Sequence, residues 1–287
     1  MRIFFAFLLV MVLTGCQHRK FENLHSLPLQ VAGSSPDTLT LTSRRDRLVL
    51  RAGSSAAILN EVAIQLDHPV QCDAGGNWSL HPSSIRDILL PVLNRTPRRI
   101  KTILIDPGHG GHDNGAVSAS GLKEKELNLA LAREIAAALK KQGFAVYLTR
   151  NRDKFVSLNE RPAMIGRVKA DLFISVHHNA SATNPGAAGM ETFVLRAETT
   201  PEKTLAARTL RGAYLVQQKQ QTVNPAPGRG VKFARFKVLR LATCPAMLIE
   251  AGFPSNPAEA KRCASPAFQR RLAANIALAI KEFAAGL

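Results

Sequence analysis

Three side chains in this sequence have the types and positions expected of a catalytic metal site. His109 follows the apolar segment 103–105 through a glycine-rich turn. Glu124 begins a helical pattern, and His177 follows the apolar segment 172–176. Two imidazoles and one carboxylate, with a fourth position left for water, form the ligand set of a catalytic zinc site. Alone, each histidine would more often be a hydrogen-bonded core or loop residue, but their joint placement predicts that His109, Glu124 and His177 bind Zn²⁺.

A further carboxylate, Glu250, follows the apolar segment 246–249. A carboxylate at a strand end beside a metal can accept the proton of a bound water, whose pKa zinc brings close to neutrality. We therefore predict that Glu250 is the catalytic general base. His178 directly follows the predicted ligand His177, and it is either a group behind that ligand or has no role.

The glycine-rich turn 106–112 has a second interpretation as a phosphate-binding loop. Glycine suits either role because it accepts positive φ. The turn contains neither a GxxxxGK[ST] motif nor a GxGxxG motif that opens a helix, which are the usual phosphate-binding patterns. The sequence therefore favours a turn that carries a metal ligand.

These side chains require a scaffold of alternating strands and helices. Strands are expected at residues 103–105, 144–148, 172–176, 191–195 and 246–249, and helices at 127–139, 158–169, 202–219 and 268–283. This alternation predicts an α/β fold with a mostly parallel twisted sheet flanked by helices, which binds ligands at its strand ends. The catalytic domain should cover residues 100–287.

A small β-rich domain is expected before it, at residues 39–95. Its β-prone segments 48–50 and 62–66 are separated by glycine-containing turns, and a basic linker, residues 95–99, joins it to the catalytic domain. At 287 residues the chain is long enough for both units.

The first residues predict export. Residues 1–16 combine a basic start, a short apolar run and the sequence Leu13-Thr14-Gly15-Cys16, which resembles the lipobox of bacterial lipoproteins. The resemblance implies a signal peptide cut before an acylated Cys16, a polar tether at 17–38, and anchoring to a membrane in the periplasmic cell envelope. Gln17 in place of Asp implies the outer membrane, by analogy with enteric lipoproteins. The alternative is an ordinary secretory signal with a chance cysteine.

The remaining cysteines are Cys72, Cys244 and Cys263, and no C-x-x-C pair suggests a cysteine metal site. In an oxidising compartment one disulfide can form, and we predict it between Cys244 and Cys263.

The net charge of +17 attracts polyanions, with a basic cluster at residues 229–237. Nucleic acid is one such partner, but an exported lipoprotein meets little of it. We therefore expect no nucleic acid and favour the anionic polymers of the cell envelope.

The order of motifs is similar to that of the zinc-dependent N-acetylmuramoyl-L-alanine amidases of the amidase_3 family. The similarity covers residues 101–287 and rests on Asp106-Pro107-Gly108-His109-Gly110-Gly111, Glu124-Lys125, Leu148-Thr149-Arg150, Ser175-Val176-His177 and Glu250-Ala251-Gly252-Phe253. It implies the same zinc ligands and base, with peptidoglycan as substrate, and hydrolysis of the amide between N-acetylmuramic acid and L-alanine. Asn128 and Arg150 lie in family motifs and are candidates for binding substrate or bracing loops.

Two other functions fit the residues. A zinc metallo-exopeptidase needs a similar site plus an arginine for the substrate carboxylate, which no motif singles out. A non-catalytic wall-binding protein would keep the fold without the site. Some family members block the zinc with a helical insertion before the catalytic glutamate. Residues 189–244 are too few for both core and plug, so we expect an open site.

Overall fold

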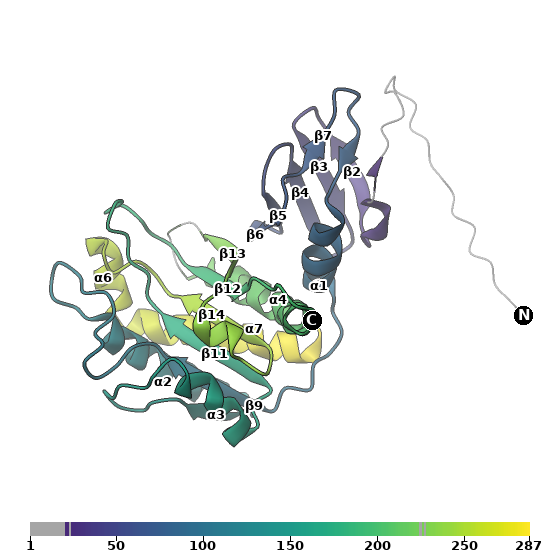
Figure 1. Ribbon diagram of the computed structural model, residues 1–287. Helices are drawn as coiled ribbons and strands as arrows, with labels where there is room; N and C mark the ends of the chain where they lie inside the picture. Colours follow the sequence, from purple (N-terminus) through teal and green to yellow (C-terminus); the bar gives the residue numbers. More distant parts are fainter. Residues whose placement is uncertain (1–20, 23, 224–225, 227) are drawn as a thin grey trace, which may run out of the picture.

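The computed structural model describes residues 21–287 except residues 23, 224, 225 and 227 (Figure 1). The predicted signal peptide and Cys16 therefore lie outside the described residues. None of the helices in the described part of the chain is both long and apolar enough to span a bilayer.

A mostly parallel sheet forms the centre of the catalytic part, as the sequence predicts. Its strands run in the order β10-β9-β11-β14-β12-β13, and only the β12–β14 pair is antiparallel. Their bounds are Thr102–Pro107 for β9, Ala145–Leu148 for β10, Leu172–His177 for β11, Glu191–Leu195 for β12, Gly230–Ala234 for β13 and Ala246–Glu250 for β14. Because β12 and β13 reverse direction, their first residues lie at the same edge as the last residues of β9, β11 and β14.

Helices cover both faces of this sheet. Alternate strand residues point to opposite faces, so Ile103 and Ile105 join one buried cluster while Leu104 joins the other. The larger cluster packs under α2 (Glu124–Lys141), α4 (Thr200–Gln220) and α7 (Pro266–Ala285). The smaller cluster packs under α3 (Glu160–Val168) and α5 (Lys237–Arg240). Helix α6 (Pro257–Cys263) comes after β14 in the chain.

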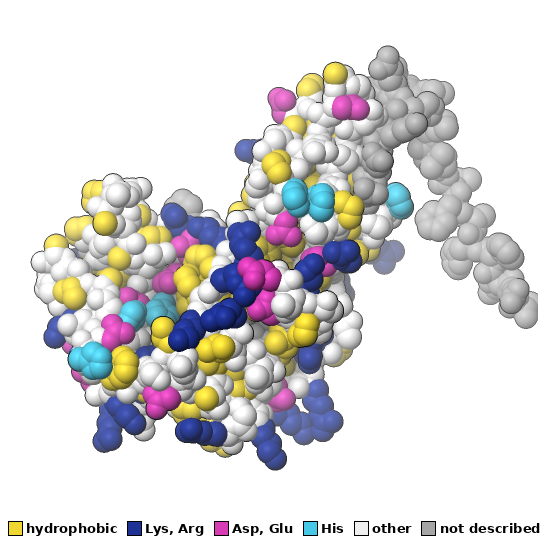
Figure 2. All heavy atoms as spheres, in the orientation of Figure 1, with side chains coloured by type: hydrophobic (Ala, Val, Ile, Leu, Met, Phe, Trp, Pro, Cys, Tyr) yellow, Lys and Arg dark blue, Asp and Glu magenta, His cyan; other side chains and the backbone are white. Residues whose placement is uncertain are grey.

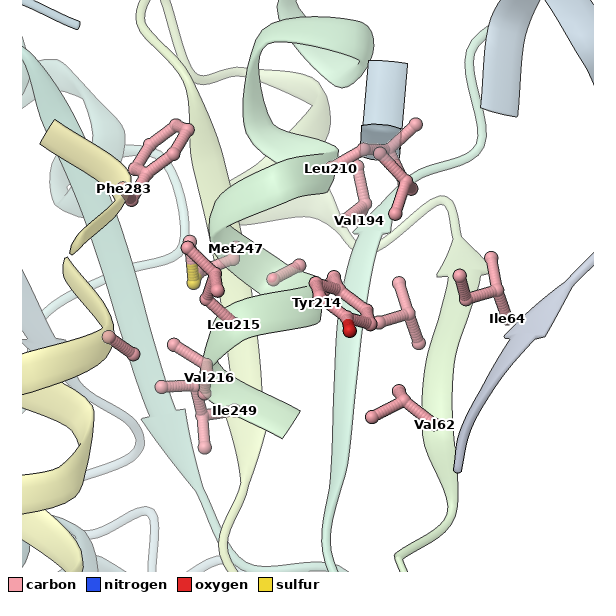
Figure 3. Packing of buried hydrophobic residues seen from close by; sticks show 14 of the residues in the cluster. Val62, Ile64, Val194, Leu210, Tyr214, Leu215, Val216, Met247, Ile249 and Phe283 are labelled. Carbon is pink, nitrogen blue, oxygen red and sulfur yellow. The ribbon is translucent and has the colours of Figure 1, made fainter. Parts of the chain in front are cut away.

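The larger cluster is the main core of the protein. Figure 3 shows Met247 and Ile249 of β14 beside the α4 residues Leu215 and Val216, while Tyr214 of α4 points toward Val194 and Ile64. Local signals fix where these helices start. Thr199 and Glu202 form a capping box at α4, in which each side chain satisfies a free backbone N–H of the first turn.

The β-rich region lies before this sheet in the chain and extends it. Antiparallel strands β2 to β6 continue the sheet beyond β13, through a parallel pairing of Val231 with Ile64. The result is one sheet of eleven strands within the described residues. The bounds are Gln30–Ser34 for β2, Thr38–Thr42 for β3, Arg47–Arg51 for β4, Ala56–Leu59 for β5 and Val62–Gln65 for β6.

Smaller elements complete this region. Strands β1, β7 and β8 form a separate three-stranded sheet, and a π-helical turn, η2, runs into α1 beside α4. The bounds are Phe21–Glu22 for β1, Leu24–Ser26 for the 3₁₀ helix η1, Gln71–Cys72 for β7, Trp78–Ser79 for β8, Ser84–Leu89 for η2 and Leu90–Leu93 for α1. The predicted β-rich region therefore precedes the catalytic sheet, with one helical segment at its end.

The predicted tether at residues 17–38 is too long. Residues 30–34 form β2, which pairs with β3, so ordered structure begins before residue 39. Every residue of β2 is exposed, and without apolar alternation the segment gives no strand signal in the sequence. Residues 17–20 of the predicted tether lie outside the described residues.

The predicted disulfide between Cys244 and Cys263 is wrong, because both are free thiols. Cys244 lies before the start of β14, in the smaller buried cluster, whereas the Cys263 Sγ lies 3.9 Å from the carbonyl oxygen of Ala251, just beyond the end of that strand. At about 3.3 Å per strand residue, the two thiols are separated by the length of β14. A disulfide needs Cα atoms within about 7 Å.

Candidate metal and catalytic site

The turn after β9 projects His109 over the carboxyl edge of the sheet. His109 itself has a φ of 60°, a left-handed conformation that is uncommon outside glycine. Arg161 of α3 holds this turn from below, since its guanidinium donates to the carbonyl oxygens of Pro107 and His109 at 2.8 and 2.9 Å. The same guanidinium forms an ion pair with the buried Asp106, whose other oxygen accepts a hydrogen bond from Ser175.

His109, Glu124 and His177 converge on one point, as the sequence predicts. His109 Nε2 lies 3.1 Å from one Glu124 oxygen, and His177 Nδ1 lies 3.0 Å from the other. One potential ligand atom from each residue lies within 4.8 Å of the others. Glu124 is buried at the first turn of α2, and both histidine side chains are about one-quarter exposed or less.

The charges of this group suit a metal cation. Burial alone would raise the pKa of Glu124, but hydrogen bonds with His109 and His177 lower it strongly. Burial would lower the pKa of His109, but contacts with Glu124 and Asp113 raise it. The buried carboxylate therefore needs positive charge, which a metal ion bound by neutral histidines would supply.

Glycine leaves the space that this arrangement requires. A Cβ at Gly115 would lie 2.7 Å from His109 Cδ2, and a Cβ at Gly108 would overlap the His177 ring. His109 Nδ1 also lies 2.9 Å from an Asp113 oxygen, a contact that orients the ring as second-layer carboxylates do in metal sites. The three residues fit a metal ion, while their role as ligands stays a prediction.

Glu250 ends β14 one strand from His177, and the two residues are paired in register. Its Oε2 is buried and has no hydrogen-bond partner among the described residues. Burial of the carboxyl group raises the pKa of Glu250 to about 7. A carboxylate with this pKa can both accept and return a proton near neutral pH.

Asn128 and Arg150 brace the site from inside the protein. Asn128 is fully buried and donates to Glu124 Oε1 at 3.1 Å. Arg150 is 3% exposed and donates to the carbonyl oxygens of Pro107 and Gly108 at 3.0 and 2.8 Å. A role of either residue in substrate binding stays a prediction.

His178 lies behind His109, Glu124 and His177, which we call the metal group. This is the first of the two roles considered for His178, a group behind the predicted ligand His177. The His178 Nδ1 lies 2.8 Å from Asn128 Oδ1, and burial lowers the pKa of His178 to about 4. The neutral His178 imidazole therefore positions the side-chain amide of Asn128, which in turn donates to Glu124. The ring's burial, and not its place beside His177, gives it this role.

The family model Amidase_3, described as N-acetylmuramoyl-L-alanine amidase, matches residues 103–282. The chain belongs to the Amidase_3 family. The match runs from the second residue of β9 through β14 and into α7, and so includes all four predicted site residues.

Relatives and solved structures agree with this assignment. The chain is 32% identical over 230 residues to AmiC of Neisseria meningitidis, and the match covers 67% of this chain but 55% of that protein. It is 30% identical to AmiA of Escherichia coli, covering 83% of this chain and 90% of that protein. The solved amidase AmiC2 of Nostoc punctiforme is 33% identical with a TM-score of 0.58, and covers 64% of this chain and 96% of that one.

The metal group of this Amidase_3 chain is open. Between β12 and β14, the described residues include one long helix, α4, which packs against α7 and β12 and so belongs to the core. No described helix lies over the metal group, in agreement with the expected open site. A cavity of about 770 Å³ lies between the loop that contains Ser118 and Leu122 and the loop that contains Pro254 and Ser255, and none of the four predicted site residues lines it.

Sequence reasoning missed the buried residues that support the site. Arg161 is 2% exposed, although a lone arginine in a helix gives no sign of burial. Glu191 is 3% exposed and pairs in register with Glu250 on the neighbouring strand. It forms ion pairs with Arg229 and Lys232 of the basic cluster 229–237. Glu191 is the first residue of β12, so it does not share the signal of Glu250, which ends an apolar segment.

Proposed function

We propose that this protein is a zinc-dependent N-acetylmuramoyl-L-alanine amidase that cleaves peptidoglycan between N-acetylmuramic acid and L-alanine. The observation that carries the proposal is the His109, Glu124 and His177 group with Glu250 beside it at one sheet edge. Membership of the Amidase_3 family supports the same reaction. The chain spans about half of the Neisseria relative, so its activity is inferred from the site.

The proposed mechanism assigns one step to each group. His109, Glu124 and His177 would hold zinc, which when bound polarises the amide carbonyl and acidifies water. Glu250 accepts the proton of the attacking water at its unpartnered Oε2. The protonated carboxyl then donates that proton to the amine of L-alanine as the carbon–nitrogen bond breaks. Its pKa, raised to about 7, suits both transfers.

The first experiment is digestion of purified sacculi, followed by mass spectrometry of the products. We expect released peptides with new L-alanine amino termini and intact sugar strands, and no release after treatment with a zinc chelator. Glu250→Gln should retain zinc and lose at least about 100-fold in rate, because it keeps the shape of the side chain but cannot accept a proton. Products shortened from a peptide end would instead indicate an exopeptidase. Wild-type rates in Glu250→Gln would refute the assigned base.

We further propose that the protein is a lipoprotein anchored at Cys16 in the periplasmic envelope, at the outer membrane. The sequence Leu13-Thr14-Gly15-Cys16 followed by Gln17 supports this. Acyl chains attached to one cysteine hold a protein at a bilayer when more than one chain is present. Radiolabelled palmitate should enter the wild-type protein and not Cys16→Ser, which should fractionate away from membranes. Equal labelling of both would refute the lipid site.

A further inference from the structure

A row of charged side chains continues from the catalytic site across the sheet. His177, Glu250 and Glu191 stand at the same level on β11, β14 and β12, because each is paired in register with the next. Gly230 of β13 is paired with Glu191, so Arg229 lies at the same edge. Neighbouring strands are about 4.8 Å apart. The Glu191 carboxylate and its partners are therefore one to two strand widths to one side of the base.

Two cations converge on Glu191. The Arg229 Nε donates to Glu191 Oε2 at 3.1 Å, and the Lys232 ammonium donates to the same oxygen. Asn179 donates to the other carboxylate oxygen at 2.6 Å. Glu191 carries one negative charge, and Arg229 and Lys232 together carry two positive charges. These three side chains therefore have a net positive charge.

Both cations also reach the surface. The Arg229 side chain is 38% exposed and that of Lys232 is 32% exposed, whereas the Glu191 side chain is 4% exposed. Arg229 lies over the ring of Phe253, with its central carbon 4.8 Å from the ring centre, a cation–π contact. Its two terminal nitrogens form no hydrogen bond to any described residue. Figure 2 shows Lys and Arg side chains beside the His and acidic side chains on this face.

A guanidinium with its Nε occupied and its outer nitrogens available is arranged to bind a carboxylate. In the proposed reaction Glu250 returns its proton to the leaving amine, so the peptide half of the substrate lies on the Glu250 side of the metal group. One peptide residue spans about 3.5 Å. A carboxylate on the residue after L-alanine can therefore reach a point about one strand width from Glu250.

We propose that Arg229 and Lys232 bind a free carboxylate on the second residue of the stem peptide, which makes the enzyme selective for acidic over amidated stems. This inference rests on the proposed amidase function. It also gives the basic cluster 229–237 a specific ligand in place of general attraction to polyanions. Arg229 binds the carboxylate through its terminal nitrogens, and Lys232 adds charge while it holds Glu191.

The test uses two disaccharide-tetrapeptides that differ only at the second residue, D-glutamate in one and D-isoglutamine in the other. Wild-type enzyme should cleave the D-glutamate substrate with a kcat/KM at least about tenfold higher, the discrimination expected when a charged group loses its partner. Arg229→Gln should remove most of this difference by raising KM for the acidic substrate alone. Arg229→Lys, which keeps the charge, should retain part of it.

Arg271→Gln is the matched control. It removes one exposed positive charge from α7, which covers the opposite face of the sheet, and it should leave the ratio unchanged. Equal cleavage of both substrates by wild type would overturn the carboxylate site and leave the amidase function standing. An equal loss on both substrates in Arg229→Gln would show that the arginine only supports Glu191. Cleavage of neither substrate would overturn the amidase function itself.

Discussion

The substitution Gly108→Ala tests whether the space around His177 is needed for metal binding. The backbone of Gly108 is outside the left-handed region, so alanine is conformationally acceptable there. The obstacle is the His177 imidazole, three of whose ring atoms would crowd a Cβ at this position. The variant therefore separates a steric effect on one predicted ligand from an effect on the backbone.

The size of the effect follows from these distances. Of the three ring atoms, Nδ1 would be the farthest from the new Cβ, at 2.6 Å, while ordinary contact begins at 3.4 Å. The ring must therefore move by at least 0.8 Å. Metal–ligand distances tolerate only about 0.2 Å. The move therefore removes His177 from the site, and we expect zinc affinity to fall by about 100-fold or more, beyond the range for loss of a supporting contact.

Stability should change much less than metal binding, because the His177 side chain is 20% exposed and can rotate outward. Zinc affinity is measured by competition with a chromogenic chelator, and folding by thermal melting of the metal-free protein. Gly166→Ala is the control: it lies in α3 with nothing within 4 Å of the added carbon, and should bind zinc normally. Wild-type zinc affinity in Gly108→Ala would refute His177 as a ligand or the geometry of the turn.

Three further outcomes follow from the buried groups. Arg161→Met should lower the free energy of unfolding by about 3 kcal/mol, because it leaves a buried carboxylate without its cation; denaturant melts measure this, and an unchanged midpoint would contradict it. Burial raises the pKa of the Cys244 and Cys263 thiols to about 12, so in Cys16→Ser only Cys72 should react with a disulfide reagent before unfolding, and all three thiols after it. Burial also raises the pKa of Glu250 to about 7, and only the carboxylate form can act as base, so kcat/KM should fall as pH drops below about 7. Bound zinc favours the carboxylate and shifts this loss to lower pH, whereas a rate that stays flat down to about pH 4 would argue against Glu250.

The strands and the metal group could be predicted because their signals are local. Buried parallel strands are continuous apolar segments, and His177 and Glu250 end two of them abruptly. Parallel strand ends meet at one edge, so the convergence of these side chains follows from topology alone. The position of Glu124 at the start of α2 follows from the helical pattern after it.

The supporting residues could not be predicted because their roles depend on contacts far apart in sequence. Arg161 is 55 positions from its partner Asp106, and both are polar residues that sequence patterns assign to the surface. β13 was also missed, since only its first two residues, Gly230 and Val231, are buried and the polar Lys232 follows them. Its pairing with β6 depends on a part of the chain that is distant in sequence.

The junction of β6 and β13 also affects how the protein reaches its native state. Ile64 can pair only when Val231 is in place. The Gln65 side chain likewise accepts its hydrogen bond from the backbone N–H of Phe233, 168 positions later. Until then the β2–β6 meander exposes an unpaired strand edge, the kind of edge on which chains associate wrongly. Such distant pairing is slow to form. The β6 edge is therefore expected to pair late in folding, and the chain is prone to aggregation until it does.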